Sequence, residues 1–139
     1  MFKKYPSKIR KALEFYYQQT KNHIYDQALT QQNTPSAIKK RGFLLSPGSD
    51  EHEACCQKML EQDQSIQTFL LLNTETNLCL AEMFLQKAHA TARAKHAKLL
   101  YMLKSGSFAN KQEKNQLNKK LVYYSSELDL YQEALRSLY

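Results

Sequence analysis

Apolar residues recur in alternating steps of four and three over the last part of the chain, from position 117 to position 138. Side chains spaced in this way lie along one face of a helix and suit knobs-into-holes packing at a shallow crossing angle. The pattern predicts a C-terminal heptad helix over 107–139. Packing within the chain and packing against a partner both satisfy it. The predicted packing or partner seam consists of Leu117, Leu121, Tyr124, Leu128, Tyr131, Leu135 and Leu138.

A second apolar stripe with a helical period runs from Cys56 to Met102. Asp50 and Glu53 have the spacing of a capping box, so the helix is predicted to begin with Asp50 as its N-cap. The stripe is interrupted by the polar patch at 73–77 but shifts across it by only about one position. We therefore predict one long, continuous or kinked helix over 50–105. A break at 73–77 would instead divide it in two.

The first third of the chain has a thinner apolar stripe and most of the residues that break helices. Proline is favoured at the first position of a helix, so Pro6 or Ser7 indicates the start of a basic first helix within 1–31. Four of the six Pro and Gly residues fall within 32–49. This composition predicts a linker loop over 32–49, with a short helical turn around 36–41.

These elements predict an all-α fold. Only three Gly and three Pro occur in 139 residues, which disfavours a turn-rich sheet protein, and this length suits one domain. We expect a single all-helical domain over 1–139. Its architecture is predicted as an antiparallel helical bundle or coiled-coil hairpin of three long helices, or four if the chain breaks at 73–77.

No apolar run approaches the ~18 residues that a transmembrane segment requires. The basic N-terminus is not followed by the apolar region of a secretory signal. The three cysteines, Cys55, Cys56 and Cys79, are an odd number, which favours reduced thiols over a disulfide framework. A cytoplasmic location is expected from these observations.

The formal net charge of +7 arises in the first third, where 1–49 holds nine Lys and Arg residues against two acids. Cations at the start of a helix oppose its dipole, so their placement there favours an anionic partner. A solvated surface that aids solubility is the alternative. The predicted basic anion-binding patch consists of Lys3, Lys4, Lys8, Arg10, Lys11, Lys39, Lys40 and Arg41.

The long second helix is divided in charge. Residues 50–82 hold one lysine against seven acids, whereas 83–106 hold five basic residues and no acid. Two copies paired antiparallel would place opposite charges side by side, which supports an antiparallel homodimer as a hypothesis. The same polarity also complements a helix dipole, so it does not require a second copy.

Candidate chemistry is sparse. His89 and His96 are seven residues apart, about 10.5 Å along a helix, which is too far for one metal ion. His52 and Cys56 have a suitable spacing, but no second pair completes a site. The sequence contains no Gly-rich phosphate loop or nucleophile elbow. We therefore predict no enzyme, no cofactor, no metal site and no catalytic residues.

The sequence is most typical of a non-enzymatic helical protein–protein interaction module, such as an adaptor, a chaperone-like protein or an assembly component. Its predicted partner is another protein or a second copy of the chain. The alternative is a small basic nucleic-acid-binding regulator that acts through phosphate-backbone contacts, although no sequence-reading motif accompanies the charge. Contact of the basic N-terminus with a membrane surface is the least favoured of these options.

Overall fold

The structure is a computed structural model that describes residues 1–139. It contains six helices and no strand, so the all-α prediction is confirmed. The helices are α1 (Ser7–Gln32), α2 (Pro35–Arg41), α3 (Asp50–Gln62), α4 (Gln64–Thr74), α5 (Leu78–Ser105) and α6 (Lys111–Arg136). An arrangement of three long helices is not confirmed. None of the six combines the length and the hydropathy that a membrane span requires.

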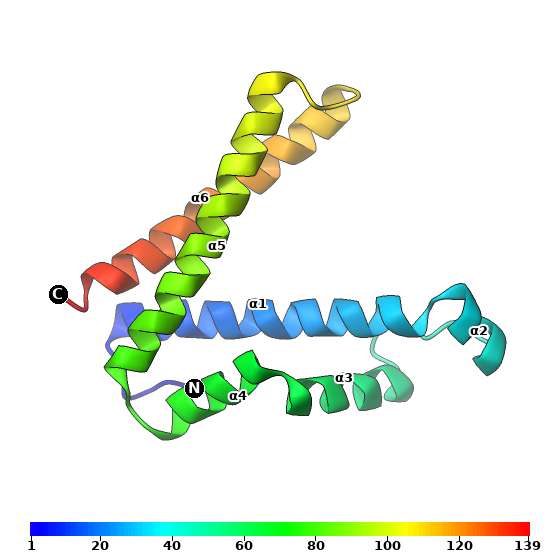
Figure 1. The fold of residues 1–139 in the computed structure, drawn as a ribbon, viewed down its shortest axis with the longest axis horizontal. Coiled ribbons are helices and arrows are strands. Elements are labelled where there is room, and N and C mark those ends of the chain that lie inside the picture. The colour runs from blue at the N-terminus through cyan, green and yellow to red at the C-terminus, as the bar shows by residue number, and fades with distance from the viewer. The chain divides into compact units, whose positions relative to one another are not determined.

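The residues form two compact units (Figure 1). One contains residues 1–13 and 76–139, which we call the hairpin unit because α5 and α6 make up most of it. The other contains residues 14–75, with most of α1 and helices α2 to α4. The single domain over 1–139 stays a prediction, and each unit is described by itself.

The prediction of one long helix over 50–105 is wrong, because two capping residues interrupt it. Asp63 has extended backbone angles, φ −79° and ψ 124°, and its carboxylate accepts a hydrogen bond of 3.0 Å from the Ile66 N–H. Asn77 caps α5 in the same way, accepting from the Leu80 N–H at 3.0 Å. Side chains that bond the nearby backbone in this way stabilise the start of a new helix. Asp63 is also the C-cap of α3, whereas α4 ends at Thr74 with Glu75 as its C-cap. The break at 77 lies in the polar patch, whereas the break at Asp63 was not predicted.

The start of α3 also differs from the prediction. Ser49 is the N-cap, and its hydroxyl accepts a hydrogen bond of 3.3 Å from the His52 N–H. Asp50 is instead the first helical residue, so it and Glu53 do not form the predicted capping box. With Glu51 they place three acidic side chains in the first turn, where the helix dipole favours negative charge.

In the 14–75 unit, aromatic contacts join the start and the end of the chain segment. The rings of Tyr16 and Tyr17 lie edge-on to Phe69 of α4, with centroids 5.2 and 5.1 Å away.

The predicted linker at 32–49 contains α2, and hydrogen bonds join its two ends. The Asn33 side chain donates to the Leu45 carbonyl at 2.9 Å and accepts from the Leu45 N–H at 2.7 Å. Leu45 is buried as a result.

In the hairpin unit, α5 and α6 run antiparallel and pack against each other (Figure 1). The connection begins at Gly106, which has a left-handed φ of 70° that favours glycine. Asn110 then caps α6 by accepting from the Glu113 N–H at 2.9 Å, and Glu113 accepts from the Ala109 N–H at 2.7 Å. These reciprocal bonds resemble a capping box and fix the turn from which the two helices leave.

Candidate functional site

The packing between α5 and α6 changes from one end of the hairpin to the other. Near the chain termini the interface is closed, because Ala81, Leu85, Ala88 and Ala92 of α5 and Tyr131 and Ala134 of α6 are all buried. Toward the loop at 106–110, Leu99 is the one buried side chain of α5, and it is 9% exposed. Leu117, Leu121 and Tyr124 of α6 are only half-buried there. We call these the base and the tip of the hairpin.

Residues 1–13 belong to the same compact unit and are bonded to the base. Lys8 pairs with Glu133 of α6 at 3.1 Å, and the Tyr5 hydroxyl accepts from the Asn77 N–H, at the start of α5, at 3.1 Å. Phe2 and Ile9 are buried. At the base, a third segment therefore adds its apolar side chains to the two helices.

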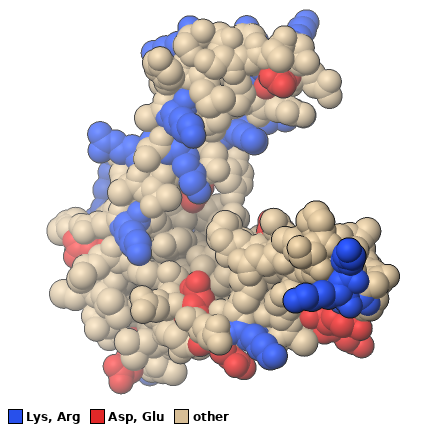
Figure 2. All heavy atoms as spheres, turned by 45° about the vertical axis from the view of Figure 1, so that its right-hand side comes forward, with Lys and Arg blue, Asp and Glu red and all other residues tan.

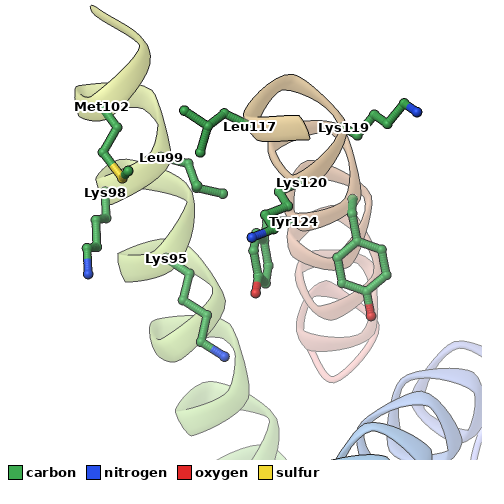
Figure 3. A pocket seen from close by; sticks show the side chains of 9 residues that line it. Lys95, Lys98, Leu99, Met102, Leu117, Lys119, Lys120 and Tyr124 are labelled. Carbon is green, nitrogen blue, oxygen red and sulfur yellow. The ribbon is translucent and has the colours of Figure 1, made fainter. Parts of the chain in front are cut away.

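At the tip, a groove of about 530 Å³ lies between the two helices. Leu99 and Met102 of α5 and Leu117 of α6 line its apolar part, together with Tyr123 and Tyr124. In Figure 3 the side chains of Leu99 and Leu117 extend into the space between the helices from opposite sides. We call this the tip groove.

Four lysines complete the lining of the tip groove: Lys95 and Lys98 of α5, and Lys119 and Lys120 of α6. No acidic residue lines it. The Lys95 ammonium lies over the Tyr124 ring, 5.7 Å from its centroid, which is a cation–π geometry. Lys119 extends away from α5 in the view of Figure 3. The groove thus has an apolar floor and a basic rim.

The positive charge extends beyond the groove. Folding brings the basic second half of α5 beside the basic first half of α6, so residues 87–120 hold nine Lys and Arg residues and one acid, Glu113. Their net charge of +8 exceeds that of the whole chain, which is +7. Figure 2 shows Lys and Arg side chains gathered over the end of the hairpin unit that holds the loop at 106–110, which is at the top of Figure 1.

Glu127 lies just below the groove, half-buried in the packing between the helices. Its carboxylate accepts a hydrogen bond of 3.1 Å from the Tyr131 hydroxyl. Burial raises the pKa of this carboxyl, and the bond from Tyr131 and the charge of Lys95 only partly oppose that rise. The pocket of about 290 Å³ lined by His89, His96 and Asp129 is a separate one.

The predicted seam residues lie together on one face of α6, and none is exposed. Tyr131 is fully buried, whereas the other six are half-buried. Much of the seam therefore packs within the chain, against α5. Its first three residues, Leu117, Leu121 and Tyr124, retain surface that is accessible to a partner.

The predicted basic patch is divided between the two units: Lys3, Lys4, Lys8, Arg10 and Lys11 lie in one, and Lys39, Lys40 and Arg41 in the other. Lys8 pairs with Glu133, and this ion pair lowers the pKa of the Glu133 carboxyl. The Arg41 guanidinium donates to the Asn33 side chain at 3.0 Å and to the Phe43 carbonyl at 3.1 Å. These two cations therefore have structural partners, whereas Lys3, Lys4 and Lys11 are exposed.

The candidate metal ligands are occupied or separated. One ring nitrogen of His52 accepts from the Gly48 N–H at 2.9 Å, and the other lies 3.1 Å from the Tyr25 carbonyl, to which it donates as a neutral imidazole. Burial raises the pKa of the neighbouring Cys56 thiol, which favours its protonated form. No three His, Cys, Asp or Glu side chains are grouped in a way that would hold a metal ion.

Sequence reasoning missed the four lysines of the tip groove as a group. The signal was present, since 83–106 is uniformly basic and 107–120 adds four lysines against one acid. A net charge summed over longer sequence segments hides this group of lysines, because the acidic residues of 50–82 and 127–133 cancel their positive charge. No family model, curated protein or solved structure matches the chain. The candidate site therefore rests on its geometry and charge.

Proposed function

We propose that this chain is a non-enzymatic helical module that acts by binding a protein partner at the tip of the α5–α6 hairpin. The observation that carries the proposal is the change in packing along the hairpin. At the base, Tyr131 and Ala134 of α6 are buried and residues 1–13 belong to the same unit, whereas no α6 residue before Tyr131 is buried and a groove lies beside the half-buried Leu117 and Tyr124. Apolar surface gathered in a concave site with a polar rim is typical of protein interfaces.

The surface around the groove supports the same proposal. Tyr123, which lines the groove, is 43% exposed, and Tyr101, which precedes the lining residue Met102 in α5, is 71% exposed. Tyrosine is enriched at the centres of protein interfaces, where its ring supplies contact area and its hydroxyl a hydrogen bond. An adaptor or assembly component would use such a surface. A second copy of the chain is the other protein partner that the proposal includes, and an antiparallel homodimer is its simplest form.

The test is photo-crosslinking in the cells that make the protein. A photoreactive amino acid at Leu117, within the groove, is compared with one at Thr91, an exposed position of the same helix pair. We expect a discrete crosslinked species from position 117 and none from position 91. Sedimentation of the purified chain separates self-association from a different partner. Equal crosslinking at both positions, or none at either with a monomeric mass, would contradict the proposal.

A second candidate function, a nucleic-acid-binding regulator acting through phosphate contacts, has one observation in its favour. The net charge of +8 over 87–120 is concentrated at one end of the hairpin. Binding of this kind is electrostatic and weakens steeply as salt rises. Absence of association with a labelled oligonucleotide even at low ionic strength would exclude it.

A further inference from the structure

We infer that the partner segment is an acidic amphipathic helix that lies in the tip groove and completes a three-helix bundle with α5 and α6. This inference rests on the proposed function and names the chemistry of its partner. Helix-in-groove recognition uses apolar side chains at positions i, i+3, i+4 and i+7 of the bound helix. Three features of the tip groove argue for such an occupant.

The first feature is the shape of the groove. It extends from Lys95 to Met102 on α5 and from Leu117 to Tyr124 on α6. Seven residue steps of about 1.5 Å give a length of about 10 Å, or two helical turns. A helix that presents apolar residues on one face for two turns would cover this floor. The packing would resemble the base, where residues 1–13 supply the third set of apolar side chains.

The second feature is the charge of the rim. Lys95, Lys98, Lys119 and Lys120 line the groove, and no acid does. A basic or neutral helix would leave these ammonium groups unpaired, whereas Asp and Glu side chains flanking an apolar face would meet those that border the space between the helices, Lys95 and Lys120 in Figure 3. Electrostatic complementarity of this kind selects partners and increases the association rate. The aliphatic stems of the lysines also extend the apolar floor, while their charges remain in water.

The third feature is the apolar floor of the groove, which other anionic partners would not cover. Phosphate groups bring no apolar surface to Leu99, Met102 and Leu117. Of the two tyrosines in the lining, Tyr124 is half-buried and has the Lys95 ammonium over its ring, which leaves Tyr123 for stacking. A base stacked on Tyr123 would still leave the apolar floor uncovered. A helix with an apolar face uses the floor and the rim together. The observations therefore favour an acidic helix over a nucleic acid.

Fluorescence anisotropy with synthetic peptides tests the inference. The probe is a labelled peptide of about 14 residues, four helical turns, with leucine along one face and glutamate on the others. Its controls are a scrambled peptide of the same composition and a peptide with lysine in place of every glutamate. We expect the amphipathic acidic peptide to bind at least about tenfold more tightly than either control, a difference of about 1.4 kcal/mol.

Paired variants locate the binding site. K95E/K98E should weaken binding of the acidic peptide at least about tenfold and strengthen binding of the lysine peptide. The matched control is K3E/K4E, which makes the same change of charge at exposed N-terminal lysines outside the groove. K3E/K4E should bind the acidic peptide and the lysine peptide with affinities within about twofold of those of the parent protein. Circular dichroism of each variant confirms that the helices are retained.

Several results would overturn the inference. One is equal binding of the amphipathic and scrambled peptides; another is an equal loss of binding in K3E/K4E, which would indicate unspecific attraction. Tighter binding of a single-stranded oligonucleotide or of phosphatidylserine vesicles, lost in K95E/K98E, would assign the groove to that partner instead. If the acidic peptide fails while crosslinking from position 117 persists, the chemistry of the partner is wrong and the proposed function stands. If crosslinking also fails, the proposed function is wrong as well.

Discussion

At the scale of single residues, Glu127 is the position where the packing of the hairpin opposes a charge. Its half-buried carboxylate accepts a hydrogen bond from Tyr131, yet burial is the largest influence and raises the pKa. A carboxyl whose pKa is higher in the folded state holds its proton more tightly there. The protonated carboxyl therefore contributes favourably to the free energy of unfolding. This contribution is complete below the ordinary pKa of 4.5 and is lost as the pH rises through the raised pKa of the folded state.

This argument predicts that E127Q stabilises the protein at neutral pH. A glutamine can still accept the bond from Tyr131 but carries no charge to desolvate. Because the side chain is partly solvated, the expected gain in the free energy of unfolding is small, about 0.5 kcal/mol at pH 7. The gain should shrink toward zero below pH ~4, where Glu127 of the parent protein is also protonated.

Urea unfolding followed by circular dichroism at the two pH values measures the difference. The matched control is D129N, which removes the same charge from an exposed position on the same helix. It should not change stability in the same pH-dependent way. An E127Q protein that is less stable than the parent at pH 7 would show that the carboxylate contributes favourably there.

At the scale of elements, the ends of the helices are set by single polar side chains. Asp63 shows this most clearly, because it ends α3 and caps α4 within one residue. D63A removes the acceptor of the Ile66 N–H and should lower the free energy of unfolding by about 1 kcal/mol. D63N keeps an acceptor of the same shape and should lie within a few tenths of a kcal/mol of the parent. Equal stabilities of D63A and D63N in urea would show that the cap does not hold the break.

The elements differ in how far the sequence predicts them. The heptad stripe of α6 and the turn at Gly106 are predictable, because a regular period and a glycine between two helical patterns leave few alternatives. The break at Asp63 is not, since the apolar period continues from Met59 to Ile66 and only one short side chain opposes it. The break before Asn77 was recognisable as an option, but periodicity alone favoured a continuous helix.

The candidate site is predictable only in part. The heptad pattern predicts that Leu117 and Tyr124 lie on the packing face of α6, whereas their half-burial and the lysine rim require the fold. Lys98 belongs to the basic segment 83–106, whereas Lys119 belongs to the separate segment 107–120. They come to one groove because the turn at 106–110 reverses the chain. Local periodicity carries information about faces of helices, but the sum of charges over a surface depends on which faces meet.

At the scale of the whole molecule, the hairpin unit is closed at one end and open at the other. The base should therefore supply most of its stability and the tip its binding surface. Tyr131 has no exposed surface, so Y131A removes a buried ring and should cost about 3–5 kcal/mol. Leu117 is half-buried beside the groove, so L117A should cost about 1 kcal/mol, because less apolar surface leaves contact.

Urea unfolding of the two variants measures this contrast. Because a small protein has only about 5–15 kcal/mol of stability, Y131A can fall below the level needed to fold. Hydrogen exchange of the parent protein then provides the same comparison without a substitution. Amides near Tyr131 and Ala88 should exchange more slowly than those near Leu117 and Leu99, since exchange reports local opening. Equal protection at both ends would mean that the tip is as firmly packed as the base, and the groove would then lack the accessible apolar surface that a partner helix needs.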